Sequence, residues 1–190
     1  GPGFAKELAD GIKNNVALVK LLMGANGFKG IEAGKALGDA IALNTVLKEL
    51  DISGGKYGDE KCDGEFVKGF SPGLSANGAL TSLNLSNNQL VPMVLPGDWT
   101  KDYKKFEGEY QWVFKHSDGT EQTSDPSHPD LTGLIALADS IKNNGALTSI
   151  TFGDEQAVTM KADMTEANLS GKQLGVSGAI IAVAFLPKCQ

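Results

Sequence analysis

The amino-acid sequence predicts an α/β fold in which short parallel strands alternate with helices, because one pattern of apolar residues returns along the chain. The best copy is residues 80–90, Leu-Thr-Ser-Leu-Asn-Leu-Ser-Asn-Asn-Gln-Leu, with leucines at its first, fourth, sixth and eleventh positions. The central leucines alternate with polar residues, which is the period of a half-buried strand. Between the copies lie apolar residues with helical spacing.

Four further segments of the chain have the same pattern with substitutions. They begin at Leu18, Leu47, Leu147 and Met164. Each copy should form one strand, whose buried side chains stand at the fourth and sixth positions, as at Leu83 and Leu85. The copy that begins at Met164 is the weakest of the five. We therefore expect about five strand units.

The ninth position of the pattern is an asparagine in two copies, Asn26 and Asn88. An asparagine side chain can donate hydrogen bonds to backbone carbonyl groups and accept them from backbone N–H groups where the chain turns. We expect this role for Asn88, and we expect Asn87 to face solvent. The other copies have Gly, Glu or Lys at this position, so a ladder of such asparagines should be interrupted.

Helical spacing of apolar residues predicts a helix before or after each strand. Residues 31–41 are the clearest case, and one helical face there comprises Ile31, Ala33, Leu37, Ala40 and Ile41. Similar spacing predicts helices around residues 4–12, 66–70, 134–141 and 179–186. Pro72 and Gly73 should kink or shorten the helix around residues 66–70, and Pro187 should end the last helix.

The repeated pattern resembles the leucine-rich repeat, because residues 80–90 match its signature at every fixed position. The interval from Leu18 to Leu47 is 29 residues, which leaves room for a full helix in each repeat. The chain is therefore similar to the ribonuclease-inhibitor-like subtype, over roughly residues 4–90 and 130–186. This resemblance implies a leucine-rich repeat solenoid, a short horseshoe arc with parallel strands inside and helices outside. Residues 1–190 would then form a single leucine-rich repeat domain.

An insertion of about residues 91–130 interrupts the repeats, since the interval from Leu80 to Leu147 is 67 residues. Alternating apolar residues over 110–115, followed by turn residues at 117–119, predict an inserted β-hairpin. The insertion contains an aromatic group, whose candidate partner-binding members are Trp99, Tyr103, Tyr110 and Trp112. Aromatic side chains often anchor interfaces when they are exposed. The alternative is that these rings form a small core that only holds the hairpin in place.

The outward face of the predicted strands is a weaker candidate for a binding surface. Its side chains are mostly small and polar, as at Thr81, Ser82 and Asn84. Such a face lacks the large aromatic anchors of a tight binding site. We therefore expect the insertion to be the better candidate for binding a partner.

The sequence predicts no catalytic residue, no cofactor and no metal site. His116 and His128 have acidic neighbours, and residues 59–65 form an acidic loop, but neither segment has the ligand spacing of a metal site. A G-x-S-x-G nucleophile motif is absent. The only two cysteines, Cys62 and Cys189, are far apart in the sequence, which favours a reducing compartment such as the cytoplasm.

The composition narrows the class of partner. The formal net charge of −6 disfavours nucleic acid and anionic membrane surfaces, and the apolar stretches are too short to span a bilayer. The resemblance implies instead a non-enzymatic protein–protein interaction module or scaffold. Its alternatives are a regulatory domain of a larger protein, for example in small-GTPase regulation, a purely structural repeat fragment, and, least favoured, a hydrolase or metal enzyme.

The C-terminal segment predicts a further contact. Residues 179–186 are almost wholly apolar. The ends of a repeat array normally need a polar cap over the last hydrophobic layer. We therefore expect either self-association through this helix or additional residues beyond it, as in an excerpt of a longer repeat array.

Overall fold

A computed structural model of the chain describes residues 2–106 and 109–190. The chain divides into two compact units. The first unit comprises Gly1–Val91 and Leu131–Gln190, and the second unit comprises Pro92–Asp130. Among the described residues, no helix combines the length and the apolar character that crossing a membrane requires.

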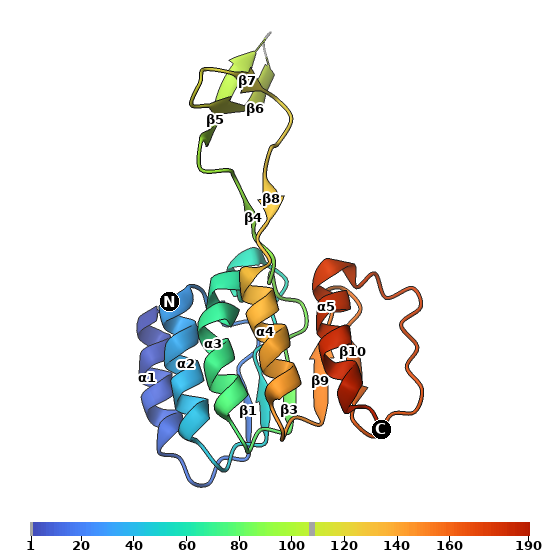
Figure 1. The fold of residues 1–190 in the computed structure, drawn as a ribbon. Coiled ribbons are helices and arrows are strands. Elements are labelled where there is room, and N and C mark those ends of the chain that lie inside the picture. Colours follow the sequence, from blue (N-terminus) through green and yellow to red (C-terminus); the bar gives the residue numbers. More distant parts are fainter. Residues whose placement is uncertain (1, 107–108) are drawn as a thin grey trace. The chain divides into compact units, whose positions relative to one another are not determined.

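Within the described residues, the first unit contains five α-helices and a five-stranded sheet (Figure 1). The helices are α1 (Pro2–Lys13), α2 (Ile31–Leu43), α3 (Gly64–Ala76), α4 (Thr132–Asn143) and α5 (Gly175–Phe185). The strands are β1 (Lys20–Leu22), β2 (Glu49–Asp51), β3 (Ser82–Asn84), β9 (Ser149–Phe152) and β10 (Val158–Lys161). Two short 3-10 helices are η1 (Gly58–Glu60) and η2 (Leu186–Lys188).

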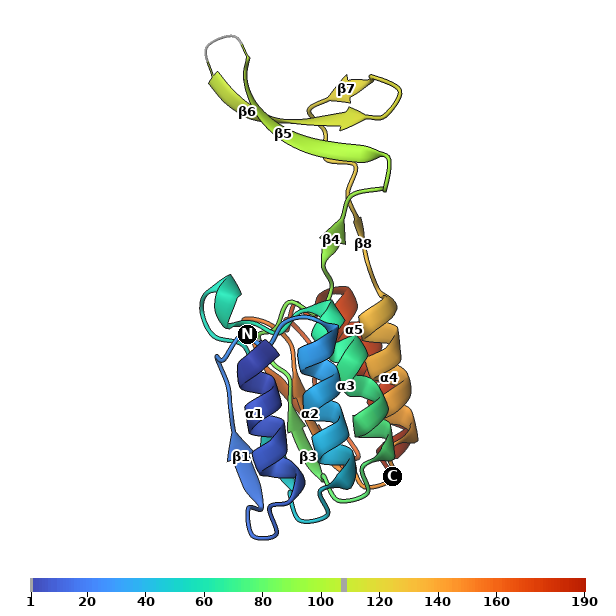
Figure 2. The same ribbon diagram turned by 90° about the vertical axis from the view of Figure 1, so that its left-hand side faces the viewer.

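The five strands form one sheet in the order β1-β2-β3-β9-β10. The first four strands are parallel, and β10 is antiparallel to β9. Helices α1 to α4 stand side by side along one face of this sheet (Figure 2). Apolar side chains from the helices and from the inner face of the strands form one hydrophobic core. The fold is therefore mixed α/β with a mostly parallel sheet.

The register of the sheet confirms four of the predicted strands. Leu21, Leu50, Leu83 and Ile150, the fourth positions of four copies, are neighbours across the sheet. Leu50, Leu83 and Ile150 are buried, as are the sixth-position residues of all four copies. The apolar pattern fixed this register because a slip by one residue would turn every buried side chain toward solvent.

The prediction of a fifth repeat beginning at Met164 was wrong. Residues 164–174 form no strand and are mostly irregular, and the fifth strand is β10, which runs antiparallel to β9. Five residues join β9 to β10, too few for the helical crossover that a parallel strand needs. Val158 and Met160 are buried and alternate with exposed Thr159 and Lys161, so β10 packs on the same core.

All five predicted helices are present. The expectation that Pro72 and Gly73 shorten α3 was wrong, because α3 continues to Ala76. Pro72 cannot donate a hydrogen bond to the carbonyl of Lys68. Pro72 and Lys68 lie on the exposed side of α3, where water can hydrate the Lys68 carbonyl group. The last helix, α5, ends at Phe185, and η2 contains Pro187.

The carboxyl ends of the helices are joined by a ladder of buried asparagines, which we call the asparagine ladder. Its members are Asn44, Asn77 and Asn144, which follow α2, α3 and α4. The side-chain oxygen of Asn77 accepts hydrogen bonds from the backbone N–H groups of Ala79 (2.9 Å) and Leu80 (2.6 Å). Each asparagine therefore shapes the turn that leads into the next strand.

The same asparagines also tie each repeat to the one before it. The Nδ2 group of Asn77 donates to the carbonyls of Ile41 (2.5 Å) and Asn44 (3.0 Å). Asn44 and Asn144 make the equivalent bonds to the preceding helix ends. At the far end, the Lys188 ammonium donates to the carbonyl of Asn144 at 2.5 Å. The ladder thus satisfies carbonyl groups that a helix end leaves without a partner.

The predicted role of Asn88 is confirmed, but the expectation for Asn87 was wrong. Asn88 is buried, and its Nδ2 donates to the carbonyls of Ile52 (2.8 Å) and Leu85 (3.0 Å). Asn87 is half-buried, and its Nδ2 donates to the carbonyl of Gly55 at 2.7 Å. Its positive φ of 58° turns this side chain toward the neighbouring repeat.

Helices α2 and α3 approach each other closely because glycines line their contact. A Cβ atom at Gly34 would lie 1.9 Å from the carbonyl oxygen of Phe66, and one at Gly73 would lie 2.0 Å from that of Gly38. Any side chain at these positions would push the two helices apart. The close approach explains why the helical segments contain glycines that helix propensity alone disfavours.

Replacing a ladder asparagine should destabilise the first unit much more than replacing its exposed neighbour. Asn144 is fully buried, and Asn144→Ala removes the amide that donates to two backbone carbonyls and accepts from two backbone N–H groups. We expect the free energy of unfolding to fall by about 1–3 kcal/mol. Asn143→Ala is the control, since Asn143 is exposed. Urea unfolding followed by far-UV circular dichroism measures the difference, and equal losses would contradict the proposed role.

Candidate functional site

The second unit is built from antiparallel strands. Its first ladder pairs β4 (Met93–Val94) with β8 (His128–Pro129), near the two ends of the unit. Its main sheet comprises β5 (Trp99–Phe106), β6 (Glu109–His116) and β7 (Glu121–Gln122), in that order. A turn at residues 117–119 joins β6 to β7, as the sequence predicted. Gly119 has a φ of 94°, a backbone conformation that favours glycine.

The longest pairing of the second unit was not predicted. Strand β5 pairs with β6 over eight residue pairs, from Trp99 opposite His116 to Phe106 opposite Glu109. The sequence of β5 is mostly polar, so it lacks the apolar alternation that identifies a strand. This register places Tyr103 directly opposite Trp112 on one face of the sheet.

Three of the four aromatic candidates form an exposed cluster, which we call the aromatic face. Its members are Tyr103, Tyr110 and Trp112, with exposed fractions of 52%, 62% and 50%. The Tyr103 ring lies 5.5 Å from the Tyr110 ring and 4.8 Å from the Trp112 ring, measured between centroids. Each ring is thus supported by a neighbour while half or more of its surface faces solvent.

A lysine that sequence reasoning missed extends this cluster. The Nζ atom of Lys101 lies 4.3 Å from the centroid of the Trp112 ring and 5.4 Å from that of Phe114. A cation over an aromatic ring is attracted by the negative face of the ring. Lys101 stands two residues before Tyr103, so both side chains project from the same face of β5. The sequence signal that could have identified Lys101 is its position two residues before Tyr103, which is the spacing of side chains on one face of a strand.

Trp99, the fourth aromatic candidate, lies apart from the aromatic face. It is half-buried, and its ring packs against the imidazole of His116 at a centroid distance of 5.1 Å. Among the described residues of the second unit, the buried hydrophobic side chains are Val113 and Phe114 of β6. Trp99 thus supports the sheet beside His116.

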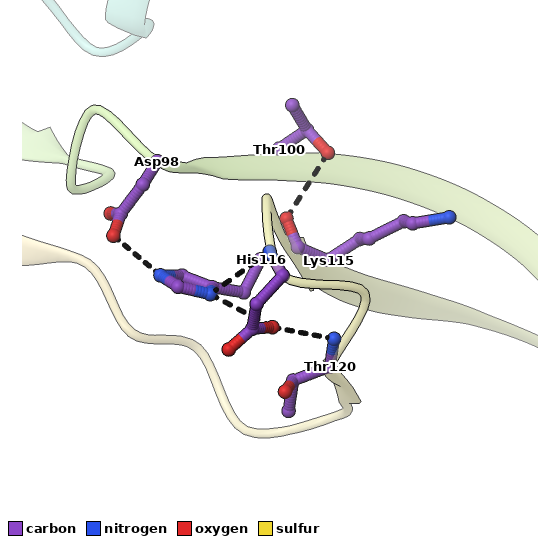
Figure 3. Close-up of polar contacts among 6 residues, drawn as sticks. Asp98, Thr100, Lys115, His116 and Thr120 are labelled. Carbon is purple, nitrogen blue, oxygen red and sulfur yellow. Dashed lines mark hydrogen bonds and ion pairs between the residues drawn. The ribbon is translucent and has the colours of Figure 1, made fainter.

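His116 is held between two carboxylates (Figure 3). Its Nε2 atom makes a close contact with the Asp98 carboxylate, and its Nδ1 atom lies 2.9 Å from the Asp118 carboxylate. Asp98 precedes β5 and Asp118 lies in the β6–β7 turn, so the imidazole joins two segments at the same end of the sheet. Nδ1 also lies 3.3 Å from the Asp118 backbone nitrogen. Because one nitrogen cannot donate and accept together, this second bond belongs to the neutral imidazole.

The two carboxylates raise the pKa of His116. Hydrogen bonds from the ring to Asp118 and then to Asp98 favour the charged imidazolium, while partial burial opposes it. The pKa of Asp118 is lowered to about 2, mainly by the backbone N–H of Thr120 and then by its hydroxyl and by His116. Both shifts favour the ion pair. The cluster holds the start of β5 to the β6–β7 turn. The sequence predicted a polar turn residue at His116 and no metal site, but it did not predict the two carboxylate contacts.

Other chemistry-bearing residues lie in structural surroundings. Within the described residues, no group of three or more His, Cys, Asp or Glu could hold a metal ion. Cys62 is buried, and burial raises the pKa of its thiol to about 12, so it stays protonated. His128 lies in β8, where it pairs with Val94.

The outer face of the five-stranded sheet is mostly polar, apart from the exposed Leu22 of β1, and several of its side chains bond to one another. Asn84 donates to the Asp51 carboxylate at 2.9 Å, and the Lys20 ammonium pairs with Glu49 at 2.8 Å. A shallow pocket of about 470 Å³ beside these strands is lined mainly by Thr, Ser and charged side chains. This face therefore has no exposed aromatic anchor on the described strands.

Comparison with known proteins shows a similarity of fold. No protein-family model matches the sequence, and no curated protein matches it. A solved structure described as "Leiomodin-1 Actin-Binding Site 2 (ABS2)" is similar with a TM-score of 0.50 and 10% sequence identity. That similarity covers 99% of this chain and 76% of the leiomodin chain, and at this identity it concerns the fold alone. The tropomodulin C-terminal domain of Caenorhabditis elegans has a TM-score of 0.40 and 9% identity, over 97% of this chain and 92% of its own.

His116 should make the stability of the second unit depend on pH. A histidine whose pKa is raised on folding stabilises the folded state fully below its ordinary pKa of 6.5. This stabilisation is lost as the pH rises through the raised pKa. We therefore expect a higher thermal midpoint at about pH 6 than at about pH 8.5. Tryptophan fluorescence measures it selectively, because Trp99 and Trp112 are the only tryptophans and both lie in the second unit.

A pair of histidine variants provides the control. His116→Gln cannot be protonated, so it should remove the difference between the two pH values. His128→Gln should keep the difference, since His128 is exposed in β8 and contacts neither Asp98 nor Asp118 in the described hydrogen bonds. If the thermal midpoints of wild type and His116→Gln depend on pH in the same way, the contacts of His116 with Asp98 and Asp118 do not contribute to stability.

Proposed function

We propose that this chain is a non-enzymatic protein-interaction module of the leucine-rich repeat type, in which the first unit is a horseshoe-like solenoid scaffold. Four strand–helix copies in one register support this proposal. The fold similarity to leiomodin-1 agrees with it. A rigid array of repeats presents a binding surface at little cost in conformational entropy. A cytoplasmic location fits two cysteines that are both free thiols.

The proposed binding site is the aromatic face of the second unit. Tyr103, Tyr110 and Trp112 expose half or more of their surfaces and contact one another. Exposed rings that neighbouring rings already hold in position offer a large contact area and lose few rotamers on binding. This single observation distinguishes the aromatic face from the polar outer face of the first unit's sheet. Trp99 takes part indirectly, by packing against His116.

The partner that fits this surface best is an extended, proline-rich segment of another protein. Proline rings stack on exposed aromatic rings, and a proline-rich segment is already extended before it binds. The row of Tyr110, Tyr103 and Trp112 crosses two neighbouring strands, so successive rings lie within the reach of one such segment. Lys101 adds a positive charge that favours an acidic residue in the segment.

Actin is a second candidate partner, favoured by the fold similarity to the actin-binding site of leiomodin-1. Co-sedimentation with actin filaments tests it directly. A role as a regulatory domain of a larger protein, for example in small-GTPase regulation, is compatible with either partner. The chain's positively charged residues are lysines, so it offers no arginine that could serve as a catalytic finger.

Removing a ring from the aromatic face should weaken binding of a proline-rich peptide. Tyr103→Ala removes the ring that contacts both of the others, so we expect a loss of about 2 kcal/mol or more in binding free energy. Trp112 fluorescence reports binding to wild type and variant, because Trp112 remains in both. A saturable fluorescence change with a ten-residue proline-rich peptide is the expected result for the wild type.

Tyr57→Ala is the matched control. Tyr57 is also an exposed tyrosine, but it belongs to the first unit. Its replacement should leave peptide affinity unchanged. Wild-type fluorescence that does not respond to the peptide would reject the proline-rich partner. Equal affinities of Tyr103→Ala and Tyr57→Ala would move the binding site away from the aromatic face.

A further inference from the structure

Helix α5 has an apolar stripe on its exposed side. The helix has no charged residue between Gly175 and Phe185. Its buried side faces the core through Ile181 and Phe185. The opposite side exposes Val176, Val183 and the following Leu186, with exposed fractions of 56%, 63% and 49%. Their spacing of seven and three residues places them on one helical face. An exposed apolar stripe of this kind is typical of a surface that contacts another protein.

The stripe borders a groove between α4 and α5. This groove has a volume of about 380 Å³ and belongs entirely to the first unit. Its lining is mostly apolar and consists of Ile135, Ala138, Ala179, Ile180, Val183 and Ala184, with Asp139 and Lys142 at its edge. Ile135 is 51% exposed. The surface thus contains both an apolar ridge, on α5, and an apolar groove of matching chemistry beside it.

The edge of the groove has one acidic and one basic side chain. Asp139 and Lys142 stand three residues apart on α4, and both are exposed. Neither belongs to an ion pair among the described residues. Opposite charges one helical turn apart are self-complementary under a twofold axis, because Asp139 of one copy then faces Lys142 of the other.

We infer that a second copy of this chain docks on the α4–α5 groove to form a twofold-symmetric dimer. The ridge of α5 in each copy packs against the groove of the other, and two Asp139–Lys142 pairs flank the apolar contact. The patch itself has no net charge, whereas the whole chain has a formal net charge of −6. A contact between two copies through this patch therefore adds no local like-charge repulsion. The dimer uses residues of the first unit, so it can be tested independently of the proposed peptide binding by the aromatic face of the second unit.

Sedimentation equilibrium of the full chain in the high micromolar range tests the dimer. We expect the wild type to form a dimer and Val183→Asp to raise the dissociation constant at least tenfold, because it puts a charge in the apolar contact. Val16→Asp is the control, since Val16 is 83% exposed and precedes β1 at the other end of the sheet. Circular dichroism verifies that both variants fold. A strictly monomeric wild type, or equal effects of the two variants, would overturn the inference.

Charge exchange at the edge of the groove tests the twofold arrangement with surface changes that leave the core intact. Lys142→Asp and Asp139→Lys each place like charges opposite one another, so each should raise the dissociation constant several-fold to about tenfold. The double variant Asp139→Lys/Lys142→Asp should restore the wild-type value. An equimolar mixture of the two single variants should form a mixed dimer more readily than either variant dimerises alone. If the single and double variants all dissociate like the wild type, the twofold arrangement is wrong.

Discussion

The backbone carbonyls at the carboxyl ends of the helices are the constraint on which the repeat architecture depends. A helix ends with carbonyl groups that have no partner within the helix, and here those ends lie against the next repeat. The side-chain amides of Asn44, Asn77 and Asn144 bind these carbonyl groups and also bind backbone N–H groups of the following turn. The oxygen of each amide forms the following turn, while its nitrogen donates to the preceding repeat. Local chain direction and contact between repeats are therefore determined by the same residue.

Sequence reasoning found the strands and missed this ladder. The leucines that were recognised are buried because a parallel sheet needs one apolar face, and that requirement is periodic and easy to detect. The asparagines had an equally regular signal, since Asn15, Asn44, Asn77 and Asn144 each stand three residues before a repeat begins. The asparagines at the ninth position of the pattern, Asn26 and Asn88, belong to a separate set. Lys161 occupies the corresponding place before Met164, which is a physical reason to reject a fifth repeat there.

The second unit was harder to predict because its stability comes from contacts that leave little trace in composition. Strand β5 consists mostly of polar residues, and only its pairing with β6 brings Tyr103 onto Trp112. The sequence identified all four aromatic candidates but could not separate Trp99 from the exposed three. Trp99 packs against the His116 ring, whose two carboxylate partners stand 18 residues before it and two residues after it in the sequence. A unit with so few buried side chains relies on such polar and ring contacts to fix one register.

The short β4–β8 ladder has a consequence for how this protein could change over evolution. It brings the entry and exit of the second unit together, as Met93 opposite Pro129, with a further bond from the Asp130 N–H to the Pro92 carbonyl at 2.9 Å. Two chain ends held this close can replace an ordinary surface loop without stretching the scaffold that receives them. The second unit can therefore be inserted or replaced as one piece. Recombination could exchange it for another binding element, or move it to a different host protein, while the asparagine-linked repeats kept their own register.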